Sequence, residues 1–304
     1  MTGIVTKSTG SWYDVLIEGK KYECRVRGKI RLEEIKETNP VTVGDHVRIE
    51  IEEGSHAITE ILPRKNHISR LSVKKTGHSN ILAANIDQAI LIATLQQPRT
   101  SLGFIDRFLV SAEAFRIPQI LVFNKIDLYD ADDFESVQGL RRTYERIGVT
   151  IYFTSTLKNE GIEDFKKILT GKISLIAGHS GVGKSSLLNL ISPHIKQSIG
   201  EISSFNQKGT HTTTFAEMFE IDKQTFVIDT PGIKEWGLVD MTPQEISDYF
   251  PEMRELRLNC KFGSKCLHLR EPGCAIHLAL ENKEIALSRY ESYVAMAEGK
   301  DNRK

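Results

Sequence analysis

The spacing of hydrophobic residues changes twice along this chain of 304 residues. Up to about residue 62, stretches such as "WYDVLIEG" and "DHVRIEIEE" alternate apolar and polar residues and end at Gly, Lys or Asp, as strands joined by turns do. Several short strands in so small a segment predict a barrel, and we expect a five-stranded OB-type β-barrel as the first domain, residues 1–68. The polar and basic stretch 63–80 is predicted to be a linker.

From residue 81 to about residue 230, apolar strands alternate with segments of helical spacing. "IDQAILIATL", "PQILVFNK" and "KISLIAG" are typical of buried strands, and "FIDRFLVSAEAF" and "GIEDFKKILTG" are typical of helices. This alternation predicts an α/β domain, residues 69–240, with a mostly parallel sheet covered on both faces. Residues 241–304 lose the strands and predict an α-helical domain around a loop of Cys and His.

Composition adds little to this picture. The chain has 40 Lys and Arg against 40 Asp and Glu, so net charge indicates no class of partner. No apolar run is long enough to span a bilayer and the N-terminus does not resemble a signal peptide, so we expect a cytoplasmic protein without a membrane partner. One basic cluster lies in the barrel and predicts an RNA-binding face, with a solvated strand face as the alternative. Its members are Lys20, Lys21, Arg25, Arg27, Lys29 and Arg31.

The stretch "GHSGVGKS", residues 178–185, matches the phosphate-loop pattern in full. It follows an apolar strand and opens a helix, which is the context that the pattern requires. Lys184 is expected to reach the β- and γ-phosphates and to act in catalysis, and the Ser185 hydroxyl is expected to bind Mg²⁺. The nucleotide-binding residues predicted here are Gly178, His179, Ser180, Gly181, Val182, Gly183, Lys184, Ser185 and Ser186.

Two further loops predict guanine recognition. "NKID" at residues 124–127 follows an apolar strand, and Asn124, Lys125 and Asp127 are its candidate contacts. A carboxylate at Asp127 can accept both the ring N–H and the exocyclic amine of guanine, which adenine lacks as a pair, so it would select GTP over ATP. Ser155 ends the next strand, where a backbone N–H could meet the guanine O6.

The remaining expected elements surround the γ-phosphate. Asp229 and Gly232 belong to "DTPG", which fits a Mg²⁺-linked carboxylate and a close backbone approach to the phosphate. Thr212 or Thr213 of the Thr-rich stretch is expected to complete the Mg²⁺ shell. No Gln follows Gly232 closely, so His211 is the candidate group for holding or deprotonating the attacking water.

The order of these motifs differs from that of ordinary GTPases, because "NKID" comes before the phosphate loop. A sheet keeps its site when the old termini are joined and the chain is cut elsewhere, so the order predicts a circularly permuted GTPase. With both flanking domains, the chain resembles the RsgA (YjeQ) family of small-ribosomal-subunit-dependent GTPases. The resemblance rests on "GSWYDVLIEGKKYECRVRGKIR", "NKIDL", "GHSGVGKSSLLN", "HTTT" and "DTPGI".

The last cluster is Cys260, Cys266, His268 and Cys274. Three thiolates and one imidazole can close a structural zinc site, although the spacing is not that of a common zinc finger and free buried thiols are the alternative. The family resemblance implies a Cys/His zinc subdomain at this place, and hence one structural Zn²⁺ per chain.

The resemblance implies a monomeric GTPase that acts late in maturation of the small ribosomal subunit. It implies contact with ribosomal RNA, stimulation of GTP hydrolysis by the subunit, and release after GDP and phosphate form. A non-catalytic RNA-binding factor in which nucleotide sets a conformation is the first alternative. An ATP-using kinase or transport ATPase with the same phosphate loop is the second, and Asp127 argues against it.

Overall fold

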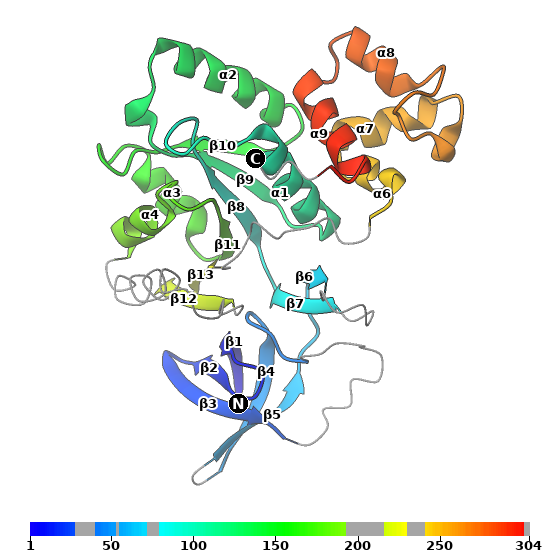
Figure 1. Cartoon of the computed structure of the whole chain (residues 1–304). Coiled ribbons are helices and arrows are strands. Elements are labelled where there is room, and N and C mark those ends of the chain that lie inside the picture. The colour runs from blue at the N-terminus through cyan, green and yellow to red at the C-terminus, as the bar shows by residue number, and fades with distance from the viewer. Residues whose placement is uncertain (28–39, 53–54, 72–78, 193–215, 230–240, 301–304) are drawn as a thin grey trace.

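The computed structural model describes residues 1–27, 40–52, 55–71, 79–192, 216–229 and 241–300 (Figure 1). The chain runs from a small barrel through a central sheet layered with helices to a group of C-terminal helices. Several predicted site residues therefore lie outside the described residues. They are Lys29, Arg31, His211, Thr212, Thr213 and Gly232.

The first five strands form the predicted barrel. They are β1 (Thr2–Ser8), β2 (Tyr13–Ile17), β3 (Lys20–Val26), β4 (His46–Glu52) and β5 (Ser55–Ile61). They pair in the order β1-β2-β3-β5-β4, and β4 pairs back onto β1 to close the barrel. Alternate residues such as Val5, Val15 and Ile58 point into one shared core, as the alternating pattern requires.

The prediction of a linker at 63–80 is wrong. Two antiparallel strands lie there, β6 (His67–Leu71) and β7 (Ser79–Ala84), and β6 spans the predicted domain boundary at residue 68. Ile68 of β6 and Ala83 of β7 are the buried side chains that these strands add to the core of the central domain, so the hydrophobic pattern was too weak to reveal the strands.

The central sheet has the strand order β10-β9-β8-β11-β13-β12. The strands are β8 (Gln88–Ala93), β9 (Gln119–Phe123), β10 (Thr150–Phe153), β11 (Ile173–Ala177), β12 (Glu217–Asp222) and β13 (Thr225–Asp229), and all neighbours except β12 and β13 are parallel. Helices α1 (Leu102–Ala114) and α2 (Ala131–Glu145) contribute to one core, and α3 (Ile162–Leu169) and α4 (Lys184–Ile191) to another. Residues of β8 alternate between these two cores, so the sheet is covered on both faces as expected.

The barrel is joined to the central sheet by strand pairing. Strand β1 lies antiparallel to the edge strand β12, with Lys7 opposite Glu217, and the two side chains form an ion pair of 3.6 Å. One sheet order therefore runs from the central domain into the barrel.

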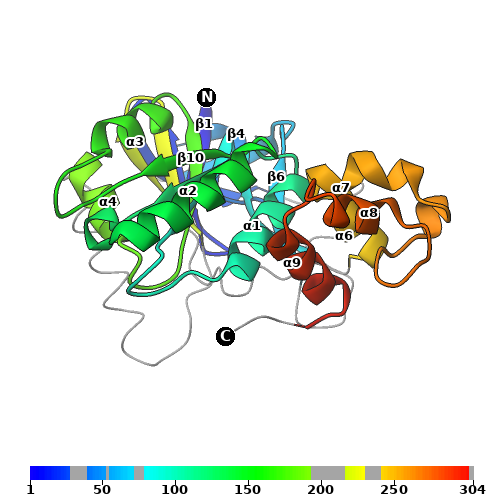
Figure 2. The ribbon, with the colours of Figure 1, turned by 90° about the horizontal axis from the view of Figure 1, so that it is seen from above.

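The C-terminal region consists of short helices, as predicted. They are α6 (Pro243–Asp248), α7 (Pro251–Leu256), α8 (Ala275–Glu281) and α9 (Leu287–Ala297), with 3₁₀ turns at Arg257–Asn259 and Gly263–Lys265. Their shared core includes three buried cysteines, and α9 lies beside α1 of the central domain (Figure 2). Among the described residues, no helix has both the length and the apolar character to cross a membrane.

Candidate functional site

The phosphate loop joins β11, in the middle of the central sheet, to the start of α4. Gly183 immediately precedes α4 with a φ of +91°, and a Cβ there would lie 2.3 Å from Asn124 Nδ2. Only glycine adopts this conformation at little cost and leaves room for the neighbouring amide. The requirement for glycine at this position therefore has both a backbone and a packing cause.

Lys184 and Asp229 meet at the carboxyl edge of the sheet. The Lys184 ammonium lies 3.3 Å from Asp229 Oδ1, because Asp229 ends β13, the strand parallel to β11. This oxygen is buried and has no hydrogen-bond partner among the described residues, so its contact with Lys184 is an ion pair alone. A buried carboxylate oxygen of this kind, beside a phosphate loop, fits the Mg²⁺-linked carboxylate that was predicted, and Ser185 is the second residue of the adjacent helix.

Asn124 braces the phosphate loop from the other side. Its side chain is fully buried; Nδ2 donates to the Val182 carbonyl at 2.8 Å, and Oδ1 accepts from the Thr154 hydroxyl at 3.0 Å. One of the two Nδ2 hydrogens is used in this contact, so the contact of the Asn124 amide with the guanine edge stays a prediction. Asn124 also holds the two nucleotide-binding loops together, and Thr154, which the sequence analysis missed, orients it.

Asp127 and Ser155, both predicted to contact guanine, are joined by a hydrogen bond. The Ser155 hydroxyl donates to Asp127 Oδ1 and accepts from the Lys158 N–H at 3.0 Å, so it fixes the carboxylate. The Ser155 N–H donates to the Glu160 carbonyl at 3.0 Å, within a small β-bridge that the sequence pattern did not show. The contact of a backbone N–H of this loop with the guanine O6 stays a prediction.

The strand order explains how the motifs assemble in reverse chain order. Strand β9, which leads into "NKID", is separated from the phosphate-loop strand β11 by β8 alone, and all three strands are parallel. The loops that follow these strands therefore lie at the same edge of the sheet, whatever the order of the strands in the chain. The Asn124–Val182 hydrogen bond joins these two loops directly.

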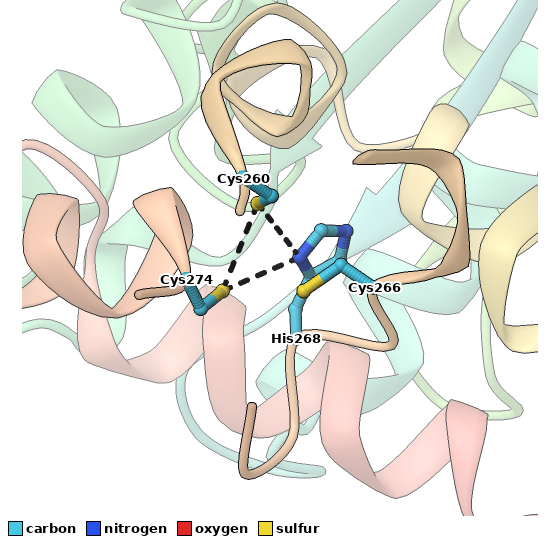
Figure 3. A group of neighbouring side chains, drawn as sticks. All are labelled: Cys260, Cys266, His268 and Cys274. Atoms are coloured by element: carbon cyan, nitrogen blue, oxygen red, sulfur yellow. Dashed lines mark hydrogen bonds between the residues drawn. The ribbon is translucent and has the colours of Figure 1, made fainter. Parts of the chain in front are cut away.

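The Cys/His cluster comes together as predicted (Figure 3). The four ligand atoms lie within 4.8 Å of one another and all four residues are buried. His268 Nδ1 is 3.5 Å from Cys260 Sγ and 3.4 Å from Cys274 Sγ, and those two sulfurs are 3.9 Å apart. Tetrahedral coordination with Zn–S of about 2.3 Å and Zn–N of about 2.05 Å gives edges of about 3.8 Å and about 3.5 Å.

The observed distances fit the edges of such a tetrahedron, so the cluster could hold a four-coordinate metal ion. Burial raises the pKa of the Cys266 thiol to about 12 and also raises the pKa of the Cys274 thiol, so these two thiols are poorly placed for ionisation unless a cation compensates them. His277 is not a fifth ligand, because its Nε2 lies 3.1 Å from the His268 carbonyl oxygen and 3.1 Å from the Tyr290 hydroxyl.

The basic cluster is only partly described. The side chains of Lys20, Lys21, Arg25 and Arg27 are exposed on or just after β3. Arg27 pairs with Glu50 at 2.9 Å, and the Arg25 guanidinium lies 3.8 Å from the centre of the half-exposed Trp12 ring. The strand thus offers a mixed face of cations and one aromatic side chain.

Comparisons with known proteins agree with this architecture. The family model described as RsgA GTPase matches residues 61–239, and that described as RsgA N-terminal domain matches residues 2–58. A Bacteroides thetaiotaomicron protein named small ribosomal subunit biogenesis GTPase RsgA 2 is 49% identical, over 100% of this chain and 98% of its own length. A Flavobacterium johnsoniae protein named small ribosomal subunit biogenesis GTPase RsgA is also 49% identical, over 98% of this chain and 93% of its own.

Two solved structures share the fold along the full length. YjeQ from Thermotoga maritima is 39% identical with a TM-score of 0.79, covering 100% of this chain and 99% of its own. YloQ, described as a circularly permuted GTPase, is 33% identical with a TM-score of 0.75, covering 100% of this chain and 96% of its own. With a permuted nucleotide site, a closed barrel and a Cys₃His cluster in one chain, this protein belongs to the RsgA family of circularly permuted, GTP-hydrolysing enzymes.

Proposed function

We propose that this protein binds the small ribosomal subunit late in its maturation and leaves after hydrolysing GTP to GDP and phosphate. The observation that carries the proposal is the permuted guanine-nucleotide site in a chain that matches named subunit-biogenesis GTPases over its full length. The subunit would stimulate hydrolysis. The protein would act as a monomer in the cytoplasm.

Each step of nucleotide binding would depend on particular side chains of the site. Asp127, held by the Ser155 hydroxyl, would accept the two guanine donors and select GTP. Lys184 would exchange its contact with Asp229 for the β- and γ-phosphate oxygens, while Ser185 and Asp229 would hold Mg²⁺ directly or through water. The metal would neutralise charge developing between the β- and γ-phosphates.

Hydrolysis needs a group that orients water, and we assign it to His211. Thr212 or Thr213 would complete the Mg²⁺ shell from the same stretch of chain. Docking on the subunit would bring His211 toward the γ-phosphate, which makes intrinsic hydrolysis slow and stimulated hydrolysis fast. The assignment rests on sequence position between the phosphate loop and Asp229.

The flanking domains would supply the RNA contacts and a rigid support. The exposed cations of β3, together with Lys29 and Arg31, would bind phosphate groups of ribosomal RNA. The Cys₃His cluster would hold one structural Zn²⁺, since three thiolates and one imidazole at tetrahedral spacing favour that ion.

Co-sedimentation with purified small subunits tests the proposal. Binding should be stronger with a non-hydrolysable GTP analogue than with GDP. Replacing Lys20, Lys21 and Arg25 together by Gln should weaken that binding and reduce its salt dependence, since fewer phosphates are neutralised. Equal sedimentation with GDP, with the analogue and without nucleotide would refute the nucleotide-controlled cycle.

A further inference from the structure

A buried arginine joins the C-terminal helices to the central domain. Arg289, on α9, is 2% exposed, and its guanidinium donates through Nη1 to Asp106 Oδ1 at 2.7 Å. It also donates through Nε and Nη2 to the two oxygens of Glu252, at 2.7 Å and 3.2 Å. Asp106 belongs to α1 and Glu252 to α7, so one side chain ties helices of two domains together.

The Arg289 guanidinium is held in one orientation in addition to being paired with two carboxylates. The Arg289 guanidinium lies 4.4 Å from the centre of the Phe250 ring, and Asp106 also accepts a hydrogen bond of 2.9 Å from the Tyr144 hydroxyl. Bidentate pairing to Glu252 leaves a planar guanidinium little freedom to rotate. The contact between Asp106 and Arg289 therefore helps to determine how α1 packs against α9.

The same helix contacts the phosphate loop two residues earlier. The rings of Phe104 and His179 lie with their centroids 3.8 Å apart and their planes at 35°. The Phe104 backbone is fixed in turn, because its N–H donates to the side chain of the N-cap Ser101. Residues two positions apart in a helix point to different sides, so α1 faces Arg289 with one side chain and His179 with the other.

We propose that Arg289 is a positioning residue for nucleotide binding. It acts through Asp106 on α1, whose Phe104 holds His179 and thereby the phosphate loop. The loop is thus held from two sides, by Asn124 at Val182 and by Phe104 at His179. A partner that displaces the C-terminal helices would change nucleotide affinity without touching the nucleotide.

A second ion pair provides a matched control. Arg254 of α7 pairs with Glu113 of α1 at 2.9 Å, so it joins the same two domains. It lies at the opposite end of α1 from Phe104, and its side chain is half exposed. Exposed pairs contribute little to rigidity. Arg254→Gln should therefore leave the phosphate loop unchanged.

The test reads the position of His179 by NMR, without ribosomes, so its result is independent of the proposed subunit binding. The chain has nine histidines, and loss of one ring resonance in His179→Gln assigns the signal. Phe104→Leu should shift that resonance downfield by removing the ring current and weaken GDP binding roughly two- to tenfold, the range for an aromatic pair. Arg289→Lys and Asp106→Asn should shift it in the same direction, and Arg254→Gln should not.

The proposal is overturned by either of two results. If Phe104→Leu leaves the His179 resonance in place, the ring contact does not exist in solution. If Phe104→Leu shifts the resonance but Arg289→Lys and Asp106→Asn do not, the contacts of Arg289 do not influence the position of the phosphate loop. Asp106→Asn keeps the size of the side chain and one oxygen that can accept from Arg289 and Tyr144, so a folded spectrum is expected from this variant.

Discussion

Replacing Gly183 by alanine should cause both backbone strain and the loss of a specific contact, and comparison with a second glycine variant separates the two effects. At φ +91° an alanine costs roughly 1–2 kcal/mol, in a conformation that L-residues avoid. The new Cβ would also lie 2.3 Å from Asn124 Nδ2 and displace the amide from the Val182 carbonyl. Leaving a buried polar group unsatisfied costs roughly 1–3 kcal/mol more. The expected loss of stability is therefore roughly 2–5 kcal/mol.

Gly148→Ala is the matched control for this substitution. Gly148 has a φ of +84°, close to that of Gly183, and a Cβ there would meet no atom within 4 Å. It should lose only the roughly 1–2 kcal/mol of backbone strain. Both variants gain the same small entropic benefit from a stiffer unfolded chain, so their difference reports the contact with Asn124.

Urea unfolding gives the two stabilities, and titration with a fluorescent GDP analogue gives the affinities. Gly183→Ala should be less stable than Gly148→Ala by roughly 1–3 kcal/mol and should bind GDP at least about tenfold more weakly, since 1.4 kcal/mol corresponds to a factor of ten. Gly148→Ala should bind GDP as the unaltered protein does. Equal stabilities together with equal GDP affinities would refute the idea that Asn124 braces the loop.

Four further substitutions and treatments have defined outcomes. Asp127→Asn should weaken GTP and GDP binding by at least roughly 1–3 kcal/mol in a nucleotide titration, because a guanine donor loses its acceptor; unchanged affinity would contradict the guanine pocket. Ser155→Ala should weaken GDP binding by about 1 kcal/mol, because Asp127 loses the hydroxyl that fixes it, and an unaltered titration would show that the hydroxyl is dispensable. Elemental analysis should find one zinc per chain, and chelation should raise hydrogen exchange at residues 250–275 before it does so in the central sheet; protein purified without zinc yet fully protected there would exclude a structural ion. His211→Ala should keep GTP affinity and subunit binding but lose most stimulated turnover, and normal stimulation would assign the catalytic group elsewhere.

The sequence predicts the strand–loop–helix context of the phosphate loop well, because this context depends on one short local stretch. A phosphate loop requires a strand, glycines and a helix start in one continuous segment, and β11 and α4 supply them around residues 178–185. The circular permutation could also be predicted, because parallel strands bring their loops to one edge of the sheet whatever the order in which the chain connects them. The Cys₃His cluster could be predicted for a similar reason, since its four residues lie within 15 residues of the chain.

Contacts between distant segments were not predictable in this way. The side chains of Arg289 and Asp106 are 183 residues apart in the chain, and neither differs locally from an ordinary helical charge. The structural roles of Asn124, which joins two loops, and of Ser155, which fixes Asp127, were not predicted, because a motif identifies residues and does not say which partner each polar atom takes. The β6–β7 hairpin was missed because β6 is mostly polar and the apolar residues of β7 are consecutive rather than alternating.

The rate of GTP hydrolysis with and without purified small subunits tests the central claim most directly. The protein alone should turn over slowly, and small subunits at saturating concentration should raise its rate by at least about tenfold, with large subunits and ATP ineffective. Lys184→Ala should abolish both rates, which excludes contaminating activity, because Lys184 is the cation nearest to the expected phosphates. An unstimulated rate in the presence of small subunits, or equal stimulation by large ones, would contradict a GTPase controlled by the small subunit.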